Sequence, residues 1–160
     1  MAIFLLDTGI LVGYIRGAGY ADYVEKMLHV SEPPNITLIS IVTKGEIYSV
    51  AIQFGWGEKK RCGLESLLRK LPFVDISNEH IIAKYAEIDS YSQGKNLSAA
   101  LPAPMTARNM GKNDLWIAAT ASVLSSTLIT TDHDFSHLNR VFLEVIRIDE
   151  KLTAADADEG

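Results

Sequence analysis

Five acidic side chains stand where strand-like segments of the chain meet helix-like segments. They are Asp7, Glu46, Asp114, Asp132 and, two residues after the last of these, Asp134. Asp7 is the most informative, because it directly follows the apolar run from Ala2 to Leu6, which is typical of a buried strand. An ionised acid is costly to bury unless it is paired, hydrogen-bonded or bound to a metal. The pattern therefore indicates a metal site, provided that the other acids reach the same place.

The elements that must position these acids alternate along the chain. Strands are expected at Ile3–Asp7, Asn35–Ser40, Phe73–Ile76, Thr127–Thr131 and Leu143–Ile148. Helical patterns lie near Tyr20–His29, Thr43–Phe54, Glu58–Leu71, Asn78–Tyr91 and Asp114–Leu124. The alternation predicts an α/β fold with a mainly parallel central sheet of about five strands and helices on both faces. Ligands bind beyond the carboxyl ends of strands in such sheets, so the acids should converge there around Mg²⁺ or Mn²⁺.

The composition fits one domain with an acidic end. The chain has 160 residues, and we expect one domain over residues 1–148 and a flexible tail over residues 149–160. The net charge is −5, but the tail alone carries −4, which leaves −1 for the domain and permits a nucleic-acid partner.

The single cysteine, the absence of a signal pattern and the short apolar runs favour a cytoplasmic protein without a membrane segment. Residues 93–111 form a long irregular stretch, which is more often functional or mobile than idle.

Purely structural explanations exist for most of these acids. The alternatives are a capping box at Thr43 and Glu46, a helix cap at Asn113 and Asp114, and a turn at Asp132 and Asp134. Asp7 is the hardest to explain in this way, because it directly follows a buried strand. The placement of all the acids at one edge of the predicted sheet favours a shared site.

The order and local setting of the acids resemble a known family. The strings "LLDTGIL", "TKGE", "KNDLWIAATA" and "LITTDHDF" are similar to those of PIN-domain nucleases, above all the VapC-type toxins of bacterial and archaeal toxin–antitoxin pairs. The resemblance runs from about Ile3 to Ile148. It implies a compact, PIN-like three-layer α/β/α domain and a ribonuclease that uses Mg²⁺ or Mn²⁺. Gly9 departs from the family pattern, in which Asn or Ser is usual.

The resemblance also assigns the site. It implies an acidic centre of Asp7, Glu46, Asp114 and Asp132, with Asp134 as an extra metal ligand and with Thr8, Asn113 and Thr131 in support. In phosphodiester hydrolysis a metal lowers the pKa of a bound water, and a second metal can hold the leaving oxygen. We expect Asp7 and Asp114 to be the principal ligands. Glu46 would be a ligand or the base, and Asp132 would bind directly or through water, at either one metal or two.

Basic side chains could bring RNA to so acidic a site. The candidates are Arg16, Lys59, Lys60, Arg61 and Lys112. Three of them open a segment that holds five of the fifteen basic residues, for which a phosphate-binding face and a solvated helix face are both open explanations. Trp56, which lies between two glycines, is the better of the two tryptophans as an exposed aromatic that faces a partner.

The function that the resemblance implies is that of a ribonuclease toxin. Its partners would be an RNA such as tRNA or ribosomal RNA, a cognate antitoxin protein and a second copy in a homodimer. One alternative is a non-catalytic RNA-binding or interaction domain on the same fold, which would not need all four acids. Another is a haloacid-dehalogenase-like phosphatase, which requires a second Asp two residues after the first, where this chain has Gly9.

Overall fold

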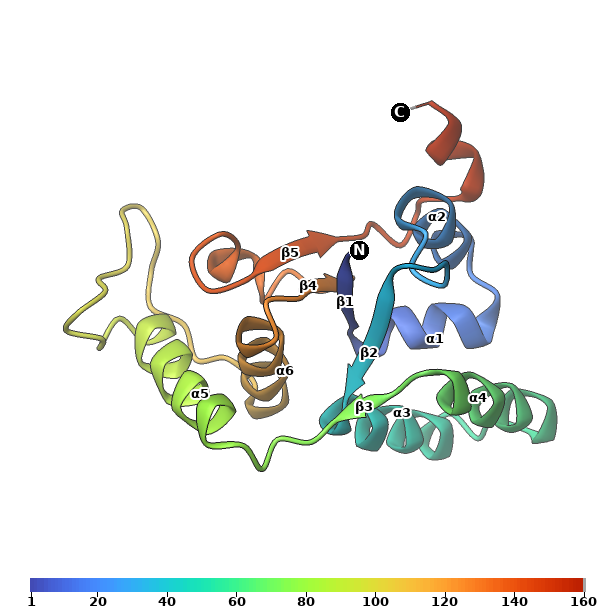
Figure 1. The fold of residues 1–160 in the computed structure, drawn as a ribbon, viewed down its shortest axis with the longest axis horizontal. Helices are drawn as coiled ribbons and strands as arrows, with labels where there is room; N and C mark the ends of the chain where they lie inside the picture. The colour runs from blue at the N-terminus through green and yellow to red at the C-terminus, as the bar shows by residue number, and fades with distance from the viewer. Residues whose placement is uncertain (160) are drawn as a thin grey trace.

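The computed structural model describes residues 1–159 (Figure 1). In chain order, the elements are β1 (Ile3–Leu6), α1 (Thr8–Arg16), α2 (Gly19–Leu28), β2 (Ile36–Ser40), α3 (Ile41–Gln53), α4 (Glu58–Lys70), β3 (Phe73–Val74), α5 (Glu79–Ser92), α6 (Lys112–Val123), β4 (Thr127–Thr130), η1 (Ser136–Leu138), β5 (Glu144–Arg147) and η2 (Ala154–Asp158). The two η elements are short 3₁₀ helices. Each predicted strand is present, and each is one or two residues shorter than predicted.

The strands form one parallel sheet in the order β3-β2-β1-β4-β5, so β1 lies at its centre. The chain adds β2 and β3 on one side of β1 and later adds β4 and β5 on the other side. The carboxyl ends of β1 and β4 therefore form the switch point at which ligands bind in open α/β sheets. Leu6 of β1 pairs with Ile129 of β4, which places Asp7 next to Thr130.

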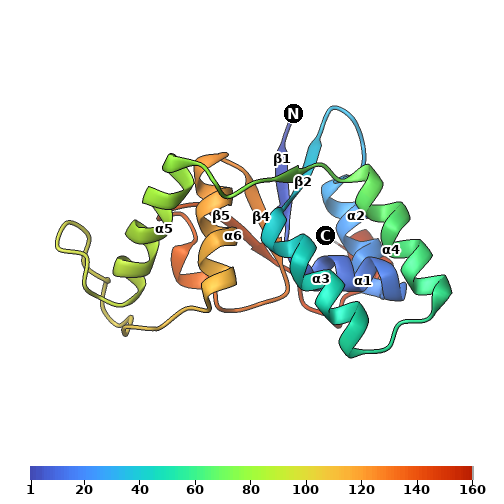
Figure 2. The same ribbon diagram turned by 90° about the horizontal axis from the view of Figure 1, so that it is seen from below.

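Helices cover both faces of the sheet and complete three layers (Figure 2). Phe4 and Leu6 of β1 point to one face, where they pack in a core with α1, α2, α3 and α4. Leu5 points to the opposite face and packs with α5 and α6. Successive side chains of a strand alternate between faces, and both faces of β1 are apolar because both are buried. The predicted α/β/α architecture is confirmed.

The helix α1 is absent from the sequence predictions above, yet it begins directly after β1. Asp7 is its N-cap, and the Asp7 carboxylate accepts a hydrogen bond from the backbone N–H of Thr8. The helix ends at Gly17, which adopts the left-handed conformation with φ 64°. Helix α2 packs closely against α1, because a Cβ at Gly13 would lie only 2.3 Å from the ring of Tyr20. This close packing holds the helix that starts at Asp7 against the body of the protein.

Trp56 is buried, with 3% of its surface exposed, so the prediction of an exposed tryptophan is wrong. Gly55 has a φ of 57°, a conformation that glycine adopts without strain, and it turns the chain between α3 and α4. The Trp56 backbone N–H then donates to the carbonyl of Ala51 in α3. The ring packs in the core with residues of α1 and α4, so the two flanking glycines did not indicate an exposed side chain.

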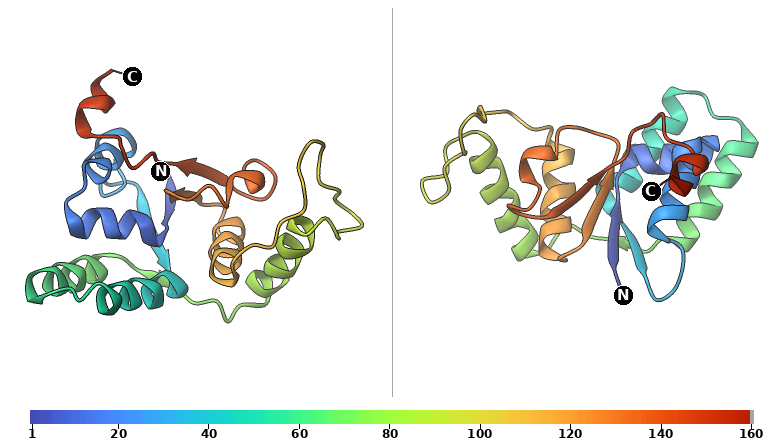
Figure 3. Two further views of the ribbon diagram at one scale, coloured as in Figure 1. Left: turned by 180° about the vertical axis from the view of Figure 1, so that it is seen from behind. Right: turned by 90° about the horizontal axis from the view of Figure 1, so that it is seen from above.

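Two further segments bear on the predictions. Residues 93–111 contain no regular element, as predicted, and project from the layer that α5 and α6 form (Figure 3). The sequence predicts no regular structure after residue 148, whereas η2 packs against α2 and Lys26 forms an ion pair with Asp158. The flexibility of the tail stays a prediction. Among residues 1–159, no helix has the length and apolar character needed to cross a membrane.

Candidate active site

Asp7 lies at the end of the central strand, and only 7% of its surface is exposed. Its Oδ1 accepts a hydrogen bond from the backbone N–H of Thr8 at 2.7 Å, and its Oδ2 accepts one from Thr130 Oγ1 at 2.6 Å. The first helix and the neighbouring strand thus fix the orientation of one carboxylate. Burial raises the pKa of Asp7, and the two hydrogen bonds oppose that rise. The negative charges of Glu46 and Asp132 raise it further.

Glu46 lies in the second turn of α3 and reaches two other helices. Its Oε1 accepts a hydrogen bond from Thr8 Oγ1 at 2.8 Å, and its Oε2 accepts one from Asn113 Nδ2 at 3.1 Å. Glu46 therefore joins α1, α3 and α6 at the carboxyl edge of the sheet. The capping-box explanation of this residue is wrong, because the side chain of Ser40 caps α3 instead.

Asp114 lies in the first turn of α6. The N-cap of this helix is Gly111, so the explanation of Asn113 and Asp114 as capping residues is also wrong. A Cβ at Gly111 would lie 3.1 Å from Asp114 Oδ2, and the glycine thus leaves room for the carboxylate. Burial and then the negative charges of Asp7 and Asp132 raise the pKa of Asp114 to about 7. A carboxyl group with that pKa is crowded by other acids.

Asp132 and Asp134 lie in the turn that follows β4. The backbone N–H of Asp132 donates to Thr130 Oγ1 at 3.0 Å, and that of Asp134 donates to Asp132 Oδ1 at 2.9 Å. The predicted turn is therefore real, but it does not exclude a functional role. One ligand oxygen each from Asp114, Asp132 and Asp134 lies within 4.8 Å of the other two, which is a spacing that one cation could bridge.

The hydroxyl that contacts two of the acids is that of Thr130, and a supporting role for Thr131 stays a prediction. Thr130 Oγ1 donates to Asp7 and accepts from the backbone N–H of Asp132, so it links two acids of the site. Thr131 instead fills the space beside Gly9, where a Cβ would lie 2.5 Å from the Thr131 hydroxyl oxygen. The unusual glycine is therefore matched to a neighbouring threonine side chain. Thr8 and Asn113 do contact the site, through Glu46, as predicted.

The donor set fits a hard divalent cation. All of the converging side chains offer carboxylate oxygens, which are ligands that Mg²⁺ and Mn²⁺ prefer. Among residues 1–159, no lysine or arginine forms an ion pair with any of these acids. Their mutual repulsion is therefore balanced only by hydrogen bonds and helix termini within the protein. A bound cation would neutralise the cluster and bring the raised pKa values down.

The five basic candidates lie in three places rather than in one patch. Arg16, Lys59 and Lys60 line a cavity of about 460 Å³ between α1 and α4. Arg61 lines a different cavity along α4. Lys112 is the first residue of α6 and so stands beside the acids. Contact of any of them with RNA stays a prediction.

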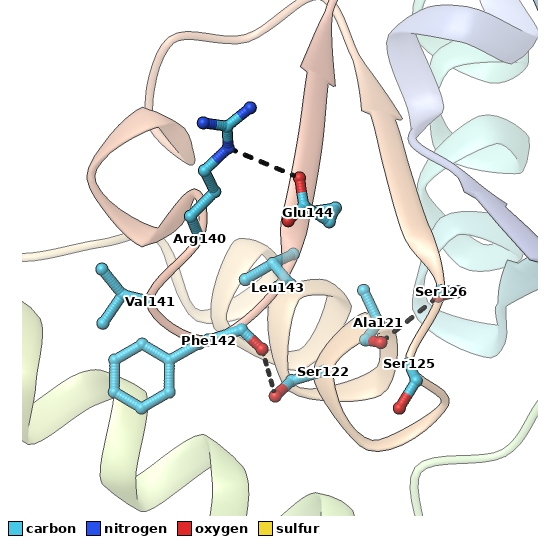
Figure 4. A pocket seen from close by; sticks show the side chains of 9 residues that line it. All are labelled: Ala121, Ser122, Ser125, Ser126, Arg140, Val141, Phe142, Leu143 and Glu144. Atoms are coloured by element: carbon cyan, nitrogen blue, oxygen red, sulfur yellow. Dashed lines mark hydrogen bonds and ion pairs between the residues drawn. The ribbon is translucent and has the colours of Figure 1, made fainter.

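Two other cavities differ in their chemistry. A cavity of about 550 Å³ runs along α3 and is lined by Thr8, Glu46 and Asn113, so it reaches one of the five acids. A cavity of about 320 Å³ lies at the opposite edge of the sheet, between the end of α6 and the start of β5 (Figure 4). There the hydroxyls of Ser122 and Ser126 donate to backbone carbonyls, as the dashed lines in Figure 4 mark. Both hydroxyls are engaged within the fold, and we assign this cavity no chemistry.

Comparisons with known proteins agree with this fold. The family model of the PIN domain matches residues 4–141. Similar solved structures include VapBC2 from Rickettsia felis bound to a promoter DNA fragment, with a TM-score of 0.71 and 22% identity over 92% of this chain and 99% of that chain. DNA-bound VapBC from Salmonella typhimurium has a TM-score of 0.66 and 17% identity over 92% and 98% of the two chains. VapBC-1 from nontypeable Haemophilus influenzae has a TM-score of 0.62 and 24% identity over 91% and 97%. No curated protein matches the chain.

The raised pKa of Asp114 predicts a pH dependence of stability in the metal-free protein. The folded protein binds this proton more tightly than the unfolded chain, so the stabilisation is full below about pH 4 and is lost as the pH passes about 7. Urea denaturation in chelator should therefore show the free energy of unfolding falling over that range, relative to Asp114→Asn. We expect a difference on the order of 1 kcal/mol, because solvent screens a half-exposed group.

The matched control for this measurement is Glu58→Gln, which removes an exposed acid from α4. Its free energy of unfolding should keep the pH dependence of the wild type. If Asp114→Asn also kept the pH dependence of the wild type, the raised pKa of Asp114 would be contradicted.

Proposed function

We propose, because the chain belongs to the PIN domain family, that it is a metal-dependent endoribonuclease and the toxin of a toxin–antitoxin pair. The observation that carries the proposal is the convergence of acids at the carboxyl ends of β1 and β4, where no basic residue of the described chain pairs with them. The substrate would be RNA, and the cofactor would be Mg²⁺ or Mn²⁺. Dimerisation and a cytoplasmic location stay predictions from the family resemblance and the composition.

The acids would share two tasks, which are the binding of the ion and the transfer of a proton. Asp7 and Asp114 would be the principal ligands of the ion, and Asp132 and Asp134 would complete its coordination directly or through water. When bound, the ion would supply an activated water and relieve the negative charge on the scissile phosphate. Glu46 accepts hydrogen bonds on both of its oxygens, which fixes its carboxylate at the mouth of the cavity along α3. From there it would bind the ion or accept the proton of the attacking water.

A hydroxyl that orients the ligands would support this chemistry. Thr130 holds Asp7 by donating to its Oδ2 and holds the start of the Asp132 turn by accepting its backbone N–H. Partners of this kind set the orientation of metal ligands and contribute to the affinity for the ion. The cavity along α3 is lined by Glu46 and by both residues that donate to it, so a strand of RNA bound there would contact this part of the site.

The nuclease proposal predicts that Asp7→Asn and Asp114→Asn each lower the rate of RNA cleavage at least about a hundredfold, because each removes a ligand of the catalytic ion. The measurement is cleavage of a pool of tRNA and ribosomal RNA with Mn²⁺, with and without chelator. Asp22→Asn, which removes an acid from α2, is the matched control and should keep full activity. Full activity of either site variant at matched purity, or undiminished cleavage in chelator, would refute the assignment. RNA binding without any cleavage by the wild type would favour the non-catalytic alternative.

An antitoxin is the second part of the proposal. Solved structures with the same fold are toxin–antitoxin complexes, and this chain has a surface that a partner would cover. Ile52 and Phe54, at the end of α3, are 74% and 64% exposed. The guanidinium of Arg16 lies 5.1 Å from the centre of the Phe54 ring, so Phe54 lies beside the cavity between α1 and α4 that Arg16 lines. We expect an apolar helix of the antitoxin there and an arginine at the acids, since its paired donors fit carboxylates.

Co-expression with the product of the adjacent upstream gene should therefore give a soluble complex with suppressed RNA cleavage. Phe54→Asp should weaken that complex at least about tenfold, because it places a charge in an apolar contact. Ile82→Asp, at an exposed apolar position of α5, is the matched control and should leave the affinity unchanged. If the neighbouring product does not bind, or binds without reducing cleavage, the toxin proposal loses its support.

A further inference from the structure

The long segment between α5 and α6 is a cationic arm that leads into the helix that carries Asp114. Residues 90–113 contain no acidic residue, although the whole chain has a net charge of −5. The basic residues of this stretch are Lys95, Arg108 and Lys112. The segment ends at α6, whose first turn carries Asp114, so the arm projects from the layer that also supplies the site (Figures 1 and 3).

The base of the arm is fixed by buried contacts. The backbone N–H of Arg108 donates to the carbonyl of Ser92 at 2.7 Å. The hydroxyl of Ser92 lies 2.7 Å from Nε2 of His137 and 3.4 Å from the sulfur of Met110. Ser92, Met110 and His137 are all buried. The two ends of the arm are therefore tied to each other and to η1, which follows the turn of acids after β4.

The two sides of the arm lie against each other near its base. Gly94 has a φ of 67°, and a Cβ placed on it would lie 3.6 Å from the Cβ of Ala107. This packing brings Lys95, on the outgoing side, to the same cavity as Arg108, on the returning side. The cavity has a volume of about 280 Å³ and is lined by Gln93, Lys95, Ala107, Arg108 and Asn109.

The chemistry of this cavity is that of an anion site. Two cationic side chains and two amides surround it, and none of its lining residues is acidic. The ammonium of Lys95 contacts Gln93 Oε1 at 3.1 Å, and the amide of Gln93 in turn donates to Asp89 Oδ1 at 2.9 Å. Among residues 1–159, neither Lys95 nor Arg108 forms an ion pair. An arginine fork and a lysine point charge together suit a phosphate group.

The residues of the cavity also lie close to η1, which follows the turn that carries Asp132 and Asp134. After burial, the positive charge of Arg108 is the next cause that lowers the pKa of His137, to about 4, so the two side chains are close. His137 follows Asp134 by three residues, and its Nε2 lies 2.7 Å from the hydroxyl of Ser92. Arg108, Ser92 and His137 therefore connect the cationic cavity to η1, which begins two residues after Asp134.

We propose that this cavity is a phosphate subsite, in which Lys95 and Arg108 hold a backbone phosphate of the RNA strand. The proposal rests on the nuclease function proposed above. An acidic centre repels RNA, and a cationic cavity in the layer that supplies Asp114 would help to hold the strand on the protein. Contacts to phosphates set affinity and position but carry no sequence choice, so the cleavage position would not depend on them.

The test is a salt titration of RNA binding in the inactive Asp7→Asn protein. Each phosphate contact to single-stranded RNA contributes about 0.7 to the slope of log affinity against log salt, so Lys95→Ala with Arg108→Ala should lower the slope by about 1.4. Arg69→Ala with Lys70→Ala, which removes two exposed charges from the last turn of α4, is the matched control and should leave the slope nearly unchanged. Arg108→Lys should keep the slope, because it keeps the charge. In the active protein, the Lys95 and Arg108 double variant should cut RNA at the same position more slowly.

The outcomes separate this proposal from the nuclease proposal. RNA binding with an unchanged slope in the double variant would overturn the subsite, even if the wild type cleaves RNA. A lowered slope in a protein that never cleaves RNA would support the subsite and overturn the nuclease. No binding of RNA at low salt would overturn both.

Discussion

The burial of a carboxylate at the end of the central strand is the constraint on which the site depends. Asp7 is surrounded by the sheet and by α1, and its two oxygens receive one hydrogen bond each from Thr8 and Thr130. Two neutral donors do not remove the unfavourable free energy of burying a charge, and further acids add to it. The protein places more carboxylates around this position instead of a lysine or an arginine. A bound cation would compensate the negative charge of these carboxylates.

The fold meets this constraint through strand register and helix starts. The pairing of Leu6 with Ile129 sets Asp7 beside Thr130. Glu46 and Asp114 lie in the first two turns of α3 and α6, at the same edge of the sheet. Helix N-termini carry partial positive charge, which offsets part of the repulsion among carboxylates. The scaffold is thus able to hold the acids together before an ion binds.

The acids themselves could be predicted from the sequence, because each stands in a short local pattern that ends a strand or opens a helix. Thr130 could not be distinguished from Thr131, because the choice depends on register between two strands that are more than a hundred residues apart. The helix α1 escaped prediction because Asp7 serves both as the end of the strand and as the helix cap. Local composition also misled for Trp56, whose flanking glycine turns the ring into the core.

The same limit applies to the basic residues. Sequence density pointed to Lys59, Lys60 and Arg61, yet the fold divides them between two cavities along α4. The cavity that holds Lys95 and Arg108 is formed by residues from the two ends of a long segment, and no local sequence pattern predicts that they lie close together. The positions of the basic side chains therefore depend on non-local packing, whereas the acids stand in short local patterns that the sequence shows directly.

The most direct measurement is calorimetric titration of the metal-free protein with Mn²⁺ near pH 6.5, in two buffers of different ionisation enthalpy. If the crowded acids hold the ion, binding should release protons, because the ion displaces them from carboxyls with raised pKa values. Thr130→Val should weaken binding about ten- to a hundredfold, whereas Thr127→Val on the same strand should not. Binding without proton release and with equal affinity in Thr130→Val, or no binding of Mn²⁺ at all, would contradict the account.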